Sequence, residues 1–153
     1  MTPPLTKGTT ISVRFSAVVD GDTIRVYLPS NPKAESIRLL NIDTEESVSF
    51  SSKPKTPWGL KAKSFAYSFF KGTENVELEF LGTESVDVAL EKHRGLFGRV
   101  LAYVYKDGID FQYVMTRKGY TPYFNKYGNA TFASHHARYV AAEHQAQIEA
   151  IGV

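Results

Sequence analysis

The sequence predicts an α+β fold that is mainly a small closed β-barrel with helices packed on it. Three observations predict it: a strand-rich first half, a helix-like segment inserted before the fourth strand, and two helix-like segments after the last strand. At 153 residues the chain is long enough for one domain with its own core. We therefore expect a loose leader over residues 1–10 and a single domain over residues 11–153.

The five expected strands share a high content of β-branched and apolar residues. They cover residues 11–19, 23–28, 35–42, 76–81 and 100–105. Asp20-Gly21 lies between the first two and is a strong short-range signal for a hairpin. The fourth segment alternates apolar and acidic side chains, as a half-buried strand does.

Three helices are expected to interrupt or follow the strands. They cover residues 57–71, 110–118 and 131–148. The first begins with Pro57 and ends at Gly72, and the second begins with the capping residue Asp110 and ends at Gly119. Five strands with a helix inserted before the fourth favour the five-stranded oligonucleotide/oligosaccharide-binding (OB) barrel with three α-helices.

Composition and charge set wide limits on function. Hydrophobic residues make up 42% and charged residues 22% of the chain, as in a folded globular protein. No apolar run approaches the roughly 20 residues of a membrane span, and residues 1–10 hold no apolar signal-peptide core. The absence of cysteine excludes disulfides and thiolate metal sites. The net charge of +2 is compatible with a polyanionic partner without requiring one.

Three acidic residues, Asp22, Asp43 and Glu46, form a candidate metal group. Taken singly, each has an ordinary alternative: Asp22 as a turn residue, and the other two as residues of a solvated loop. Both acidic segments follow strand ends, however, where a barrel could bring them together. Carboxylate oxygens with a backbone carbonyl and waters suit Ca²⁺.

Two arginines, Arg38 and Arg99, lie beside apolar strand segments. A guanidinium stays charged and offers a planar fork that matches phosphate oxygens. Two such forks could neutralise the charge that grows on a phosphoryl transition state. The alternative is an ordinary strand arginine that faces water or forms a salt bridge.

Aromatic residues are concentrated before the last helix: Tyr113, Tyr120, Tyr123, Phe124 and Tyr127. Such rings near a cationic groove can stack on bases without sequence preference, or they can pack in the core.

The four histidines lack the spacing of a zinc site, and we interpret them as surface residues.

Taken together, three motifs resemble the staphylococcal (micrococcal) nuclease, or thermonuclease, family. They are, in chain order, residues 19–23 (Val-Asp-Gly-Asp-Thr), 38–46 (Arg-Leu-Leu-Asn-Ile-Asp-Thr-Glu-Glu) and 98–105 (Gly-Arg-Val-Leu-Ala-Tyr-Val-Tyr). Several spaced motifs are far more specific than any one of them, and the similarity runs from about residue 11 to the end.

The resemblance implies a staphylococcal-nuclease-like OB barrel and Ca²⁺-dependent hydrolysis of DNA and RNA, with 5′-hydroxyl and 3′-phosphate products. It implies Ca²⁺ ligation by Asp22, Asp43 and the Thr44 carbonyl. It implies that Glu46 orients or deprotonates the attacking water, and that Arg38 and Arg99 clamp the phosphate.

This chain departs from the family pattern at Glu45, where a proline is usual, and at Leu96-Phe97, where the staphylococcal enzyme has a lysine and a tyrosine that hold the terminal phosphate. By position, the resemblance implies that Tyr123, with Tyr127 nearby, stacks on the base. Phe97 occupies one of the phosphate-holding positions, and we expect His93 or Arg94 to replace the missing contact.

The alternative function is a catalytically weak or inactive nuclease-like module that binds nucleic acid or serves as a scaffold in a larger protein. The presence of both arginines and of all three acids argues against it. The resemblance also implies a secreted or extracytoplasmic location and no membrane partner, and nothing requires more than a monomer.

Overall fold

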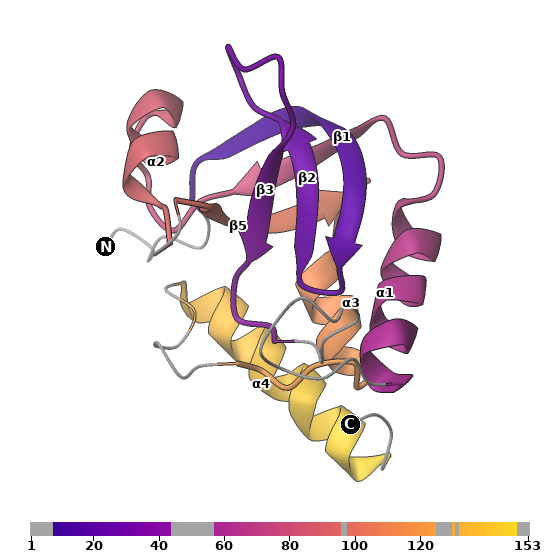
Figure 1. The fold of residues 1–153 in the computed structure, drawn as a ribbon. Helices are drawn as coiled ribbons and strands as arrows, with labels where there is room; N and C mark the ends of the chain where they lie inside the picture. Colours follow the sequence, from indigo (N-terminus) through magenta and orange to yellow (C-terminus); the bar gives the residue numbers. More distant parts are fainter. Residues whose placement is uncertain (1–7, 44–56, 96–97, 125–129, 131, 150–153) are drawn as a thin grey trace, which may run out of the picture.

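A closed barrel of five strands forms the centre of the molecule (Figure 1). The structure is a computed structural model, and it describes residues 8–43, 57–95, 98–124, 130 and 132–149. The strands are β1 (Thr10–Asp20), β2 (Thr23–Tyr27), β3 (Glu35–Leu39), β4 (Asn75–Glu79) and β5 (Val100–Lys106). They pair antiparallel in the order β3-β2-β1-β4-β5, and a parallel pairing of β3 with β5 closes the barrel. The predicted five-stranded barrel is confirmed, and its strand pairing is mixed.

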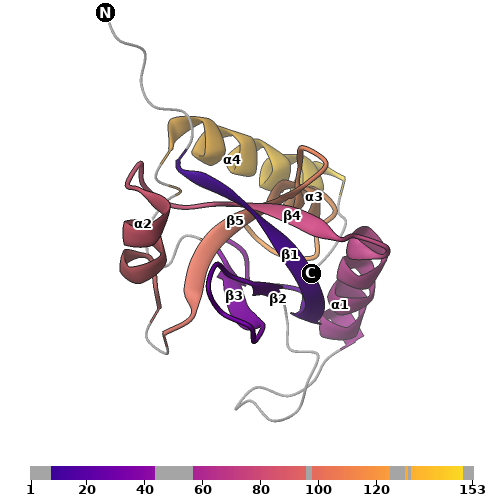
Figure 2. The ribbon, with the colours of Figure 1, turned by 90° about the horizontal axis from the view of Figure 1, so that it is seen from above.

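Helices surround the barrel on three sides. They are α1 (Pro57–Phe70), α2 (Val86–Lys92), α3 (Phe111–Arg117) and α4 (Ala133–Ile148), and a two-residue strand β6 (Ile109–Asp110) pairs with β5. Figures 1 and 2 show α1 beside β1, α2 on the opposite flank, and α3 next to α4. The short helix α2 was not predicted, because it spans only seven residues and is too short for a sustained apolar repeat.

The barrel interior is filled by apolar side chains that alternate with exposed ones along the strands. On β2, for example, Ile24 and Val26 are buried while Arg25 is exposed. This alternation is the period-two pattern of a strand with one face on a core. Helix α1 adds Ala62, Ala66 and Phe70 to the same core.

A second, smaller core lies between the barrel and α4. Its buried residues are Tyr103, Tyr123, Ala130 and Tyr139. This core fixes α4 against the outer surface of β5, so the C-terminal helix is part of the folded domain.

A buried polar group, here called the Glu79 cluster, consists of Glu79, Tyr105, His135 and the backbone N–H of Gly8. One Glu79 oxygen lies 2.6 Å from His135 Nε2 and accepts a hydrogen bond from the Tyr105 hydroxyl at 2.6 Å. The other accepts from the Gly8 N–H at 2.8 Å. The cluster thus joins the N-terminal segment, the barrel and α4.

The prediction that the histidines lie on the surface is wrong for two of them. His135 is buried in the Glu79 cluster, and His93 is buried beside Phe80, with its Nε2 3.1 Å from Glu84 Oε2. His135 is buried because it meets Glu79, a partner distant in the sequence, and His93 is buried because it packs against Phe80. The spacing of histidines along the sequence reports neither contact.

The N-terminal segment is held to β4 from its first described residues. Besides the Gly8 contact, the Thr9 N–H donates to the Gly82 carbonyl, and the Phe80 N–H donates to the Thr9 carbonyl. The remainder of the expected leader, residues 1–7, lies outside the described residues. Among the described residues, no helix has the length and apolar character needed to cross a membrane.

Candidate catalytic site

The site is built where the β1–β2 turn meets the end of β3. Asp20 ends β1 and its carboxylate accepts a hydrogen bond from the Gly21 N–H at 2.8 Å, which shapes the tight turn. The Leu39 N–H then donates to the Asp22 carbonyl at 2.9 Å. The turn and the end of β3 are therefore fixed to each other, and their side chains share one end of the barrel.

Two carboxylates converge on one guanidinium in this place. Arg38 Nη2 lies 3.5 Å from Asp22 Oδ2 and 3.4 Å from Asp43 Oδ1. Arg38 Nη1 donates to the Leu39 carbonyl at 2.7 Å, which holds the guanidinium in position. We call these three residues the Asp22 cluster. It brings together two predicted metal ligands and one predicted phosphate-binding arginine.

The Asp22 carboxylate is electrostatically unfavourable in its charged form. Burial raises the pKa of Asp22 above its ordinary value, and the Arg38 guanidinium opposes this shift. The nearby carboxylates of Asp20 and Asp43 raise the pKa further, because like charges disfavour ionisation. Burial and these like charges therefore outweigh the Arg38 guanidinium in their effect on the pKa of Asp22.

The donor set fits a hard cation that prefers oxygen ligands. The Asp22 and Asp43 side chains are 13% and 33% exposed, so ligand oxygens are both sheltered and reachable. Among the described residues, no three His, Asp or Glu side chains are grouped to hold a metal, so this part of the chain supplies two carboxylates of such a site. Thr44 and Glu46 lie outside the described residues.

Asp43 is positioned by two residues that the sequence analysis did not assign to the site. Asn41 has a left-handed backbone with φ of 61°, which asparagine tolerates, and it accepts a hydrogen bond from the Tyr103 hydroxyl at 2.8 Å. The Asp43 N–H donates to the Thr121 hydroxyl at 2.7 Å. The turn at Asn41 also explains why β3 ends at Leu39 and not at residue 42 as predicted.

Arg99 immediately precedes β5, the strand that pairs in parallel with the strand of Arg38. In the parallel register Arg38 is opposite Leu101, and the alternating residues Val100 and Ala102 are buried in the core. Arg99 comes directly before Val100, and its carbonyl accepts a hydrogen bond from the Gly95 N–H. Among the described residues, no carboxylate lies within ion-pair distance of the partly exposed Arg99.

The structure places two predicted substrate-binding residues in structural roles. Tyr123 is 6% exposed, and its hydroxyl accepts from the Ala130 N–H and lies 2.9 Å from His136 Nδ1. A ring packed in this way is not open to a base. Arg94 donates to the Leu90 and Gly98 carbonyls and to Glu35. Phe97 and Tyr127 lie outside the described residues.

A comparison with known proteins shows the family to which this chain belongs. The model of the staphylococcal nuclease homologue family matches residues 36–153, which is most of the chain. This chain belongs to the staphylococcal nuclease family. The resemblance inferred from the three motifs is therefore confirmed.

Two relatives come from Bacillus subtilis (strain 168). Endonuclease YncB is 31% identical over 112 residues, which are 71% of this chain and 46% of that protein. SPbeta prophage-derived endonuclease YokF is 32% identical over 112 residues, which are 71% of this chain and 33% of that protein. The chain thus spans less than half the length of these two relatives.

In this member of the staphylococcal nuclease family, the Asp22 cluster extends beyond the segment that the family model matches. Arg38, Asp43 and Arg99 lie inside residues 36–153, whereas Asp22 precedes them. The contacts of Asp22 with Leu39 and Arg38 join the β1–β2 turn to the matched segment. The site therefore depends on the whole barrel.

Proposed function

We propose that this chain is a Ca²⁺-dependent nuclease that hydrolyses phosphodiester bonds of DNA and RNA with little sequence preference and leaves 5′-hydroxyl and 3′-phosphate ends. The observation that carries the proposal is the convergence of Asp22 and Asp43 on Arg38. Groups that can hold a cation and a group that can hold a phosphate stand within one ion-pair distance of each other. Membership of the staphylococcal nuclease family supports the same activity.

The acids would hold the ion. Asp22 and Asp43 would ligate Ca²⁺, together with the carbonyl of Thr44. A bound Ca²⁺ supplies a Lewis acid that polarises the phosphate. The raised pKa of Asp22 supports this assignment, because a carboxylate held among like charges gains from a divalent counter-charge.

The arginines would hold the phosphate. Once the two carboxylates are neutralised, Arg38 can direct its remaining N–H groups to a phosphate oxygen, since its position is kept by the Leu39 carbonyl. Arg99, next to the strand that pairs with β3, would bind a second oxygen and favour departure of the 5′-oxygen. Glu46 would orient or deprotonate the attacking water.

The test is incubation of the protein with single-stranded DNA in Ca²⁺ and, in parallel, in excess EGTA, followed by gel electrophoresis. We expect shortening only with Ca²⁺, and we expect the products to accept a 5′-phosphate from polynucleotide kinase without prior dephosphorylation. The matched variant is Asp22→Asn, which should give intact DNA in both lanes. Intact DNA in every lane from folded wild-type protein would contradict the proposal and favour the binding-module alternative.

A further inference from the structure

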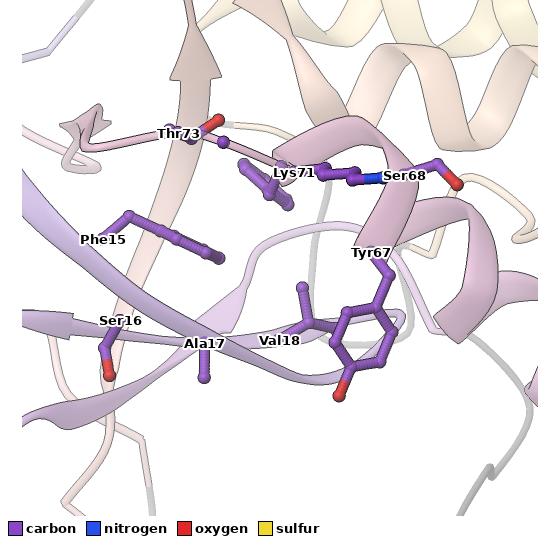
Figure 3. A pocket seen from close by; sticks show the side chains of 10 residues that line it. Phe15, Ser16, Ala17, Val18, Tyr67, Ser68, Lys71 and Thr73 are labelled. Carbon is purple, nitrogen blue, oxygen red and sulfur yellow. The ribbon is translucent and has the colours of Figure 1, made fainter.

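A groove lies between β1 and α1, apart from the Asp22 cluster (Figure 3). Its volume is about 560 Å³. Phe15, Ser16, Ala17 and Val18 of β1 form one wall; Tyr67, Ser68 and Phe70 of α1, with residues 71–73 after it, form the other. Among the described residues, the lining contains one lysine, aromatic rings and hydroxyl groups, and no acidic side chain.

A second hollow lies on α1 and shares Ser68 with the first. It is lined by Leu60, Lys61, Ser64, Phe65, Ser68 and Tyr120. In the part of the chain that the structure describes, this lining too has one lysine, aromatic rings and hydroxyls, and no acid. Between residues 57 and 74 the sequence has three lysines and only one acidic residue, Glu74. The two hollows therefore form one cationic, aromatic surface across α1.

Tyr67 is the most exposed ring on this surface. It is 54% exposed, although it is a large aromatic side chain. Lys63 Nζ lies 5.8 Å from the centre of its ring, so a positive charge lies beside the ring. Figure 3 shows the Tyr67 ring beside Val18 at the groove. An exposed ring with adjacent lysines is the arrangement that stacks on bases and contacts a phosphate backbone without reading sequence.

The groove leads toward the proposed catalytic site along β1. Val18 lines the groove, and Asp20 at the end of the same strand begins the catalytic turn. Two residues of strand span about 7 Å. A strand of nucleic acid that leaves the Asp22 cluster along β1 therefore meets this surface.

We propose that the α1 surface is an exosite that binds the single-stranded part of a polynucleotide outside the catalytic site. The inference rests on the proposed function for the identity of its ligand. The excess of lysines over acids between residues 57 and 74 favours a polyanion over an extended peptide. Tyr67 stacks on a base, and Lys71 contacts the phosphate backbone.

The test is the affinity for a fluorescein-labelled oligothymidylate of 12 nucleotides, measured by fluorescence anisotropy in excess EGTA so that no cleavage occurs. We expect Tyr67→Ala with Lys71→Gln to raise the Kd at least about fivefold, the lower bound for loss of one stacked base. We also expect the slope of log affinity against log salt to be smaller in magnitude by about 0.7, because one phosphate contact is lost. Both side chains are exposed, and unchanged circular dichroism would verify the fold.

The matched control is Lys33→Gln, because Lys33 is an exposed lysine in the β2–β3 turn, beyond the opposite end of β2 from the catalytic turn. Its Kd should stay within twofold of wild type. Unchanged affinity and salt slope in the double variant would overturn the exosite and leave the groove to a peptide or to no ligand.

Measurements of cleavage distinguish failure of the exosite proposal from failure of the proposed nuclease function. Wild-type cleavage of a dinucleotide tests catalysis alone, whereas the exosite predicts that the double variant lowers the ratio of kcat/KM for a long strand to kcat/KM for the dinucleotide. A ratio equal to that of wild type would contradict the exosite.

Discussion

The Asp22 cluster and the Glu79 cluster each hold a sheltered carboxylate, but their surroundings shift its pKa in opposite directions. Glu79 is 1% exposed in its side chain and receives three close polar partners from three parts of the chain. Burial alone raises the pKa of Glu79, but its contacts with His135, Tyr105 and Gly8 outweigh burial and leave the pKa below its ordinary value. The pKa of Asp22 is shifted in the opposite direction.

The difference indicates which carboxylate is structural and which is functional. A buried carboxylate with enough donors stabilises the fold, and its removal leaves those donors unsatisfied. A carboxylate that is buried among like charges is unfavourable in its charged form and gains from an added positive charge. We therefore expect changes in the Asp22 cluster to affect activity and changes in the Glu79 cluster to affect stability.

The largest expected effect is on activity, from replacing an arginine beside the acids. Arg38→Ala or Arg99→Ala should fold normally and lose nearly all cleavage, because removal of a preorganised donor to the transition state costs roughly 3–4 kcal/mol. The measurement is kcat/KM on single-stranded DNA. Arg25→Ala, an exposed strand arginine of β2, is the matched control and should retain activity. Near wild-type turnover in either site variant would remove its assigned role.

The next effect is on stability, from Glu79→Gln. The amide cannot accept from all three partners, so at least one buried donor should lose its acceptor at a cost of about 1–3 kcal/mol in the free energy of unfolding. Urea unfolding measures this cost. Glu77→Gln on the same strand is the control, because Glu77 is exposed and should change stability little. Equal stabilities of the two variants would show that the Glu79 cluster does not hold the fold together.

A comparable but more local effect is expected from Thr121→Val. This change removes the acceptor of the Asp43 N–H while it keeps the size of the side chain. We expect weaker Ca²⁺ activation, because Asp43 is no longer fixed, and a loss of about 1 kcal/mol in stability. The midpoint of activity against Ca²⁺ concentration measures the first effect. A midpoint equal to that of wild type would show that Thr121 does not position Asp43.

The smallest effect is the pH dependence of the Glu79 contribution. Because the folded-state pKa of Glu79 lies below the ordinary value of 4.5, its stabilisation is present above pH 4.5 and is lost as the pH falls through the lower folded-state pKa. The stability difference between wild type and Glu79→Gln should therefore shrink from neutral pH toward about pH 3. His135 and Tyr105 face the same carboxyl group, and His135→Gln serves as a second variant. If the stability difference between the two proteins grew on acidification, the pKa of Glu79 in the folded state would be raised and not lowered, which would contradict this prediction.

The barrel could be predicted from the sequence because its signals are local. Alternation on β2 and the Asp-Gly turn at Asp20-Gly21 are patterns within a few residues. The motifs also identified Asp22, Arg38 and Asp43 as one candidate site. The structure places these three together, because the β1–β2 turn is bonded to the end of β3.

The unpredicted features depend on partners distant in the sequence. His135 meets Glu79 across 56 positions, and Asp43 meets Thr121 across 78. No local pattern reports such pairs, so His135 was interpreted as a surface residue and Thr121 was not considered. Tyr123 illustrates the same limit, because an aromatic ring before a helix has the same sequence signal whether it stacks on a base or packs in a core.

The most direct test of the central claim is the effect of Ca²⁺ on the free energy of unfolding of wild type and of Asp22→Asn. If the Asp22 cluster holds the ion, Ca²⁺ at a hundredfold excess over its Kd should stabilise wild type by about 2.7 kcal/mol. The same concentration should leave Asp22→Asn nearly unchanged. Equal stabilisation of both proteins, or none of wild type, would contradict the claim that these carboxylates form the cation site.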